Sequence, residues 1–198
     1  MAATILLVRH AVHTQYNQCL SGRTAGVPLS EIGREQARAL AAYLSQDGIA
    51  RVECSPLDRT RETGAALAER VGVPLFVSQP LIEIDMGEWT GRAMGSFGDD
   101  PAWRAWNEQR ATAHIPGGET MVDAQARIVG HLRQVAAEQD GHTVALVSHS
   151  DMIRAGIAWA LGLSLDNLLR FDIDPASVSR MVVGDWGARV LSVNERAN

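Results

Sequence analysis

Two short apolar segments of this 198-residue sequence each end in a histidine. Residues 4–8 lead directly into Arg9 and His10, and residues 145–147 lead towards His149. A neutral imidazole is a competent nucleophile at pH 7, while arginine offers planar, permanently charged donors that match phosphate oxygens. The Arg9–His10 pair is therefore suited to phosphoryl transfer, although one such pair is weak evidence by itself.

Strands and helices must alternate to position these residues. Both apolar segments are typical of buried strands, and capping residues with apolar periodicity indicate helices around them. The predicted helices span residues 30–48, 57–71, 121–138 and 151–161, and a predicted hairpin pairs residues 179–183 with 189–193. This order predicts an α/β fold, a three-layer sandwich with a mainly parallel central sheet. Ligands of such sheets bind beyond the carboxyl ends of the strands, which is where both histidines fall.

The length of the chain and the lack of a linker predict one domain over residues 1–198. Residues 92–118 interrupt the alternation of elements. They contain Trp103 and Trp106, with glycines and prolines near each end and no clear period. We expect this segment to be an inserted cap over the site.

The charge balance argues against several classes of partner. Lysine and arginine total 18 against 23 aspartate and glutamate, so the net charge of −5 gives no reason to expect binding to nucleic acid or to an anionic membrane. The apolar N-terminal stretch is too short for a signal peptide or a membrane span. An anionic substrate would need a local cationic pocket.

Cysteine and histidine usage predicts a cytoplasmic protein without a metal or another cofactor. Cys19 and Cys54 form neither a metal-ligand pattern nor a disulfide framework, which favours reduced thiols. His114, His131 and His142 lack metal-like spacing and are expected at the surface. The sequence leaves a homodimer open.

Six segments, in one order along about three quarters of the chain, resemble the histidine phosphatase superfamily, also called the phosphoglycerate mutase-like family. They are LLVRH at 6–10, SGRTAGVPLSEIGREQA at 21–37, SPLDRTRET at 55–63, LIEIDMGEWTG at 81–91, PGGET at 116–120 and VSHSDMIRA at 147–155. Each segment alone is modest, but their joint occurrence is specific. The resemblance implies a Rossmann-like α/β sandwich and a transient phosphohistidine.

The resemblance also assigns roles, position by position. The family's nucleophile falls on His10 and its first phosphate-binding arginine on Arg9. Arg59 matches the second arginine. His149 matches the second histidine, which the family uses to hold the phosphoryl oxygens. Glu83 matches the proton donor.

A proton donor at pH 7 needs a raised pKa, because a carboxyl group in water titrates near about 4.3. Burial or a neighbouring phosphate would have to raise the pKa of Glu83. Asp85 and Glu88 are the rival carboxylates, and the position of Glu83 in its motif favours Glu83 over both.

The sequence departs from the family's usual Arg-His-Gly-Glu-Thr opening, because Ala11 follows His10. An alanine at a position that needs a positive φ would strain the backbone. Asn17 and Ser21 are candidate neutral donors to the phosphate, at a shifted spacing. His13 is a candidate for lining the pocket, although a loop histidine is more often exposed.

The predicted function is a metal-independent phosphatase that acts on a small phosphorylated metabolite through a phosphohistidine on His10. One alternative is a phosphoglycerate mutase, which returns the phosphoryl group to the substrate. The mutases that the chain resembles carry an arginine beside the acid, whereas this chain reads Glu-Ile-Asp-Met-Gly from Glu83. A catalytically weak binding module is a second alternative, motivated by the altered residues after His10.

Overall fold

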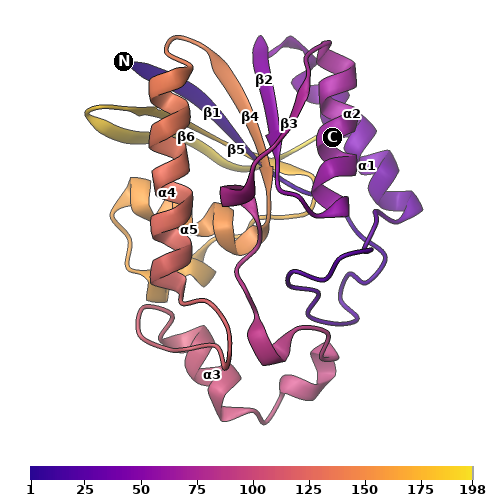
Figure 1. Cartoon of the computed structure of the whole chain (residues 1–198), viewed down its shortest axis with the longest axis vertical. Helices are drawn as coiled ribbons and strands as arrows, with labels where there is room; N and C mark the ends of the chain where they lie inside the picture. The colour runs from indigo at the N-terminus through magenta and orange to yellow at the C-terminus, as the bar shows by residue number, and fades with distance from the viewer. Residues whose placement is uncertain (198) are drawn as a thin grey trace.

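The computed structural model describes residues 1–197, in which a six-stranded sheet lies between two pairs of helices (Figure 1). The strands are β1 (Ala2–Arg9), β2 (Ile49–Cys54), β3 (Leu75–Val77), β4 (Thr143–Ser148), β5 (Ser177–Gly184) and β6 (Gly187–Arg196). The helices are α1 (Glu31–Tyr43), α2 (Asp58–Val71), α3 (Pro101–Glu108), α4 (Met121–Glu138) and α5 (Ser150–Leu161). Short 3₁₀ helices cover Leu44–Gln46, Gln79–Leu81, Gly87–Trp89, Met94–Phe97 and Leu165–Arg170.

The sheet has the strand order β3-β2-β4-β1-β5-β6. Strands β1 to β4 run parallel, whereas β5 and β6 form an antiparallel hairpin at one edge. The predicted three-layer α/β sandwich with a mainly parallel sheet is confirmed. Because β1 and β4 are parallel neighbours with Arg9 opposite Ser148, the residues that follow the two strands leave the sheet side by side.

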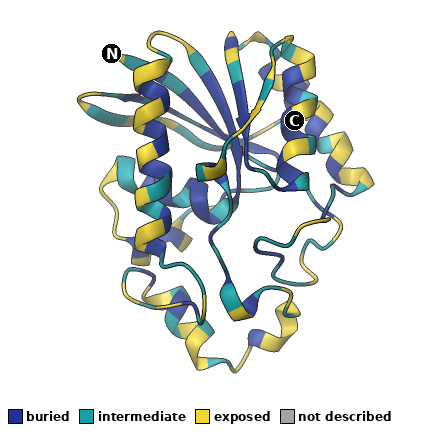
Figure 2. Ribbon diagram, viewed as in Figure 1, coloured by how far each residue is buried: buried dark blue, intermediate teal, exposed yellow. Residues whose placement is uncertain are grey.

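Each face of the sheet has its own apolar core, because side chains alternate along a strand. On β1, Ile5 and Leu7 pack in the core that contains α4 and α5, while Leu6 and Val8 pack in the core that contains α1 and α2. Figure 2 shows the central strands buried and the outer faces of the helices exposed. This burial on both faces explains the continuous apolar sequence of β1.

Local capping signals set most of the helix boundaries. The Ser30 hydroxyl accepts the backbone N–H of Gly33 at 3.0 Å and starts α1. Glycines with φ of 75° and 65° end α2 and α5, at Gly72 and Gly162. The predicted helices agree with the structure except that α1 ends at Tyr43, after which the chain tightens into a 3₁₀ turn.

Residues 92–118 form a lobe beyond the carboxyl ends of the parallel strands (Figure 1). The Asp100 side chain accepts the backbone N–H groups of Ala102 and Trp103 at 3.0 and 3.2 Å and thereby starts α3. Trp103 and Trp106 pack around the buried Trp89, with ring centroids 5.4 and 6.3 Å from it. These aromatic rings join the lobe to the apolar core on the face of the sheet that α4 and α5 cover.

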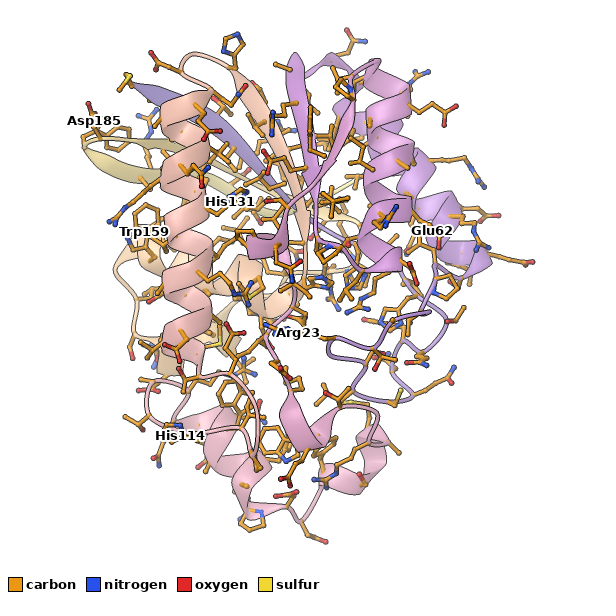
Figure 3. The ribbon with its side chains drawn as sticks, in the orientation of Figure 1. Arg23, Glu62, His114, His131, Trp159 and Asp185 are labelled. Atoms are coloured by element: carbon orange, nitrogen blue, oxygen red, sulfur yellow. The ribbon has the colours of Figure 1, made fainter. Side chains whose placement is uncertain are left out.

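The expectation that His131 lies at the surface is wrong. His131 is buried on α4, where its Nε2 lies 2.9 Å from a carboxylate oxygen of Glu53 and 3.1 Å from the Ser78 hydroxyl. A partner on β2 therefore holds this histidine inside the protein. His114 and His142 are exposed, as predicted, and Figure 3 shows His114 on the lobe formed by residues 92–118.

Candidate active site

The two histidines predicted from the strand ends lie side by side in the structure. Their ring centroids are 5.1 Å apart. The pairing of β1 with β4 extends one step further, because the backbone N–H of His10 donates to the Ser148 carbonyl at 3.1 Å. Both rings are buried, with exposed fractions of 4% for His10 and 0% for His149. The sheet therefore holds both imidazoles rigidly at its carboxyl edge.

His10 has the tautomer of a nucleophile. Its Nδ1 lies 2.8 Å from the Ala11 carbonyl oxygen, and a carbonyl can only accept a hydrogen bond. Nδ1 must therefore carry the proton, which leaves an unprotonated lone pair on Nε2. Burial, then the charges of Arg59 and Arg9, hold the pKa of His10 well below its ordinary value. The ring is thus neutral at pH 7.

The backbone strain expected at Ala11 is absent. Within residues 1–197, the non-glycine residues with positive φ are Asn17, Ala176 and Asn194, so Ala11 does not need the conformation that favours glycine. Its side chain is fully buried, and its N–H donates to the Thr63 hydroxyl at 3.1 Å. The alanine fits this loop without distortion.

Two arginines, Arg59 buried and Arg9 half-buried, flank the histidines and keep free donors. Nη1 of Arg9 donates to the Ile173 carbonyl at 2.6 Å, and Nη2 of Arg59 donates to the Gly22 carbonyl at 2.6 Å. Nε of Arg9, and Nε and Nη1 of Arg59, have no hydrogen-bond partner among residues 1–197. Unpaired buried guanidinium donors are costly, so this arrangement fits an anion that binds between the two side chains.

His149 is held by a residue that the sequence analysis did not identify. Its Nε2 lies 2.8 Å from the Ser55 hydroxyl, which also accepts the backbone N–H of Leu57 at 3.3 Å. The other ring nitrogen, Nδ1, lies 4.0 Å from a carboxylate oxygen of Glu83 and has no hydrogen-bond partner in the described chain. The position of Ser55 at the start of the segment that carries Arg59 is the signal that was available.

Glu83 has the environment expected of a proton donor. Burial, with the nearby charge of Asp151 as the second cause, raises the pKa of Glu83 to about 7. Its Oε1 accepts the backbone N–H of Ile84 at 3.0 Å, which fixes the carboxyl group. Of the two rivals, Asp85 pairs with Arg23 at 3.4 Å and Glu88 is exposed. Glu83 alone of these three carboxylates lines the cavity described below.

Two arginines bracket the backbone that carries this acid. Nε of Arg23, which is labelled in Figure 3, donates to the Glu83 carbonyl at 2.8 Å. Nη1 of Arg127 donates to the carbonyl of Ile82 at 2.8 Å. The carboxylate of Glu119 joins the two guanidinium groups, at 2.9 Å from each. No pattern in the sequence pointed to Arg127, because its contact with the acid's segment is made to backbone carbonyls distant along the chain.

Arg9, His10, Arg59 and Glu83 line one cavity of about 300 Å³, whereas His149 lies behind His10 and is not part of its wall. The lobe supplies Met94, Trp103, Asn107 and Arg110 to its wall, and the first turns of α5 supply Ser150, Asp151 and Arg154. Arg110 and Asp151 form a buried ion pair at 2.7 Å. Residues 92–118 are thereby attached to the helix that begins directly after His149.

Asn17 and Ser21 also line the cavity, but they differ in burial and in whether the side chain already donates a hydrogen bond within the protein. Asn17 is exposed, with a φ of 61°. Ser21 is buried, and its hydroxyl donates to the Gln15 side chain at 3.0 Å. His13 is buried in the same wall, so it lines the pocket, and the alternative that it is merely exposed is wrong.

Two further features of residues 1–197 bear on other kinds of site. No group of three or more histidine, cysteine, aspartate or glutamate side chains in this range is arranged to hold a metal ion. Across the same residues, no helix combines the length and the apolar character needed to cross a membrane.

Comparison with known proteins places this geometry in a family. Residues 5–196 match the model of the histidine phosphatase superfamily, branch 1. Phosphoserine phosphatase 1 of Hydrogenobacter thermophilus is 34% identical over 96% of this chain and 91% of its own. A probable phosphoglycerate mutase of Enterobacter sp. (strain 638) is 29% identical over 89% of this chain and 83% of its own.

A solved structure gives the same result. The structure of a mycobacterial glucosyl-3-phosphoglycerate phosphatase superimposes with a TM-score of 0.83, at 28% identity, over 98% of this chain and 99% of the other. Together with two histidines and two arginines gathered at the carboxyl edge of the sheet, these matches establish the relationship. The chain belongs to branch 1 of the histidine phosphatase superfamily.

Proposed function

We propose that this enzyme hydrolyses small phosphate monoesters by transferring the phosphoryl group first to His10 and then to water. The observation that carries the proposal is the unprotonated Nε2 of His10 beside the free, buried donors of Arg9 and Arg59. A phosphate dianion between these arginines has its charge neutralised while the lone pair faces the phosphorus. The phosphatase names of relatives over nearly the whole chain support this direction of reaction.

The reaction balances with the residues described. In the first step the Nε2 lone pair of His10 forms a bond to phosphorus, the ester P–O bond breaks, and Glu83 gives its proton to the leaving oxygen. In the second step the Glu83 carboxylate takes a proton from water, the water oxygen attacks the phosphohistidine, and the N–P bond breaks. Each turnover thus returns a neutral His10 and a protonated Glu83. We assign His149 to the phosphoryl oxygens, which its position beside His10 supports.

The substrate we propose is a small metabolite, because the cavity of about 300 Å³ holds a phosphate and a short leaving group. We further propose that residues 1–198 form a single domain in which residues 92–118 act as a cap. The cavity wall supplied by Trp103 and Arg110 supports that role. Asn17 remains a predicted hydrogen-bond donor to the phosphate. Ser21 is also a predicted donor, which requires its hydroxyl to break its hydrogen bond to the Gln15 side chain.

The proposed location is the cytoplasm, which the free thiols of Cys19 and Cys54 support. Nucleic acid is not a proposed partner, because the net charge is −5. A homodimer stays a prediction.

With 3-phosphoglycerate and a bisphosphoglycerate primer, we expect release of inorganic phosphate to exceed formation of 2-phosphoglycerate. A mutase must shield its phosphoenzyme from water and grip the substrate while it reorients. Here no arginine follows Glu83, and Arg110 is already paired with Asp151. Phosphate release and 2-phosphoglycerate are measured in the same reaction. Isomerisation at roughly 10 to 10³ per second with negligible phosphate release would favour the mutase instead.

Activity is expected to persist after dialysis against EDTA. Arg9 and Arg59 already supply the charge that a divalent cation would bring to the phosphoryl group. The measurement is the rate of p-nitrophenyl phosphate hydrolysis before and after chelation, with each metal then added back singly. Loss of activity that one metal restores would contradict a metal-independent mechanism.

A further inference from the structure

A third imidazole, that of His13, lies in the wall of the cavity. Its ring centroid is 5.4 Å from that of His10, and the edge-on ring of Tyr16 lies 6.0 Å away. The backbone there is fixed, because His13 pairs with Leu29 in an isolated β-bridge and the N–H of Thr14 donates to a carbonyl at 3.0 Å. His13 is therefore a held side chain inside the site and not a mobile loop residue.

The hydrogen bonding of His13 fixes its tautomer. The backbone N–H of Gln15 donates to Nδ1 of His13 at 3.3 Å, so Nδ1 is the acceptor nitrogen of a neutral ring. The proton of that ring then lies on Nε2. Nε2 of His13 makes no hydrogen bond to any residue in the range 1–197. It is also not one of the fully buried side-chain atoms that lack a partner, so part of its surface is exposed. Nε2 of His13 is thus a free donor that is accessible in the cavity.

The two neighbouring imidazoles therefore have opposite tautomers. His10 keeps its proton on Nδ1 and has a lone pair on Nε2, whereas His13 accepts at Nδ1 and has an N–H at Nε2. The first arrangement suits attack on phosphorus. The second suits donation to a phosphoryl oxygen.

Burial and neighbouring positive charge keep His13 neutral in this position. Burial, then the charges of Arg59 and Arg9, lower the pKa of His13 to about 4. Those two arginines, together with His10, His149 and Tyr16, are the titratable groups near its ring. His13 thus adds a donor without adding a charge. Such a donor is needed here, because the Ser21 hydroxyl is already used by Gln15.

Resting on the phosphoryl transfer proposed above, we propose that His13 is a further catalytic residue whose Nε2–H donates to a non-bridging oxygen of the phosphoryl group transferred to His10. The interaction tightens as charge builds on that oxygen during transfer. No bond to His13 forms or breaks, and its proton stays on Nε2.

The test compares His13→Ala and His13→Gln, with His114→Ala as the control, since His114 is exposed on the lobe. Loss of one preorganised donor typically lowers kcat by about 10²- to 10³-fold. We expect a loss of roughly 10²-fold in His13→Ala with p-nitrophenyl phosphate. In His13→Gln the side-chain amide places an N–H near the position of Nε2, and we expect it to recover activity to within about tenfold of wild type. His114→Ala is expected to match wild type.

The pH dependence of activity and the rate of phosphoenzyme formation distinguish this role from others. A neutral donor predicts a constant ratio of wild-type to His13→Ala activity from pH 5.5 to 8, because the ring stays neutral throughout that range. Equal activity in His13→Ala and wild type, a glutamine variant as poor as the alanine variant, or a ratio that grows below pH 6 would overturn the proposal. If wild type itself forms no phosphohistidine in a rapid-quench experiment, the proposed function fails. If it forms one and His13→Ala forms it at the same rate, only the role of His13 fails.

Discussion

Replacing His10 by alanine is expected to lower kcat by roughly 10⁴-fold or more, because the variant lacks the atom that accepts the phosphoryl group. Rapid quench of the wild-type enzyme with ³²P-labelled substrate should trap a phosphoenzyme that is labile in acid and stable in base. The variant should trap none. His142→Ala is the matched control, since His142 is exposed and remote from the cavity.

Two results would contradict this mechanism. One is turnover near the wild-type rate in His10→Ala. The other is a label that survives acid, or that maps to another side chain of the cavity such as Cys19. The substitution also removes the hydrogen bond from His10 to the Ala11 carbonyl. Thermal unfolding of the variant should therefore be measured to show that it still folds.

Glu83→Gln is expected to slow hydrolysis of alkyl phosphates by about 10²- to 10⁴-fold, as loss of a general acid typically does. Hydrolysis of p-nitrophenyl phosphate should fall far less, because its leaving group departs without a proton. Comparison of kcat on the two substrates measures the difference. Glu88→Gln is the control, since Glu88 is an exposed carboxylate of the same segment. Equal losses on both substrates would indicate a binding or structural role for Glu83.

The pH profile of the wild-type enzyme gives an independent test of Glu83. Its pKa is raised to about 7, so in the free enzyme the proton that the leaving group needs is present below pH 7 and is lost as the pH rises through 7. We therefore expect kcat/KM for alkyl phosphates to fall above pH 7, and that fall to be absent in Glu83→Gln. The low pKa of His10 keeps the nucleophile unprotonated on the acid side of neutrality.

The sequence predicted those parts of the fold whose signals are local. The apolar run of β1 and the start of α1 at Ser30 are of this kind, and both were placed correctly, although α1 ends earlier than predicted. Strand β2 was missed, since Arg51 and Glu53 interrupt its apolar pattern, and β3 was missed because it has only three residues. Helix α3 was missed although Asp100 followed by a proline is a recognisable helix start.

The same distinction between local and long-range signals applies to the residues of the site. His10 and His149 could be paired from the sequence, because parallel strands end at one edge of a sheet. The exact partners could not be predicted, since Ser55 on His149 and Arg127 on the Ile82 carbonyl depend on how distant segments pack. Tautomers are also beyond the sequence, because they follow from single backbone contacts.

The charge within the cavity has a consequence for the end of the catalytic cycle. Four arginines line it, Arg9, Arg59, Arg110 and Arg154, whereas Asp151 is their ionised counterpart and Glu83 titrates near 7. The product, inorganic phosphate, has the same oxygens and nearly the same charge as the group that was captured. Contacts that draw in the substrate against a net charge of −5 therefore also delay the departure of the product. We therefore expect inorganic phosphate to compete with the substrate for this cavity, so that the throughput of the enzyme falls as the surrounding phosphate concentration rises.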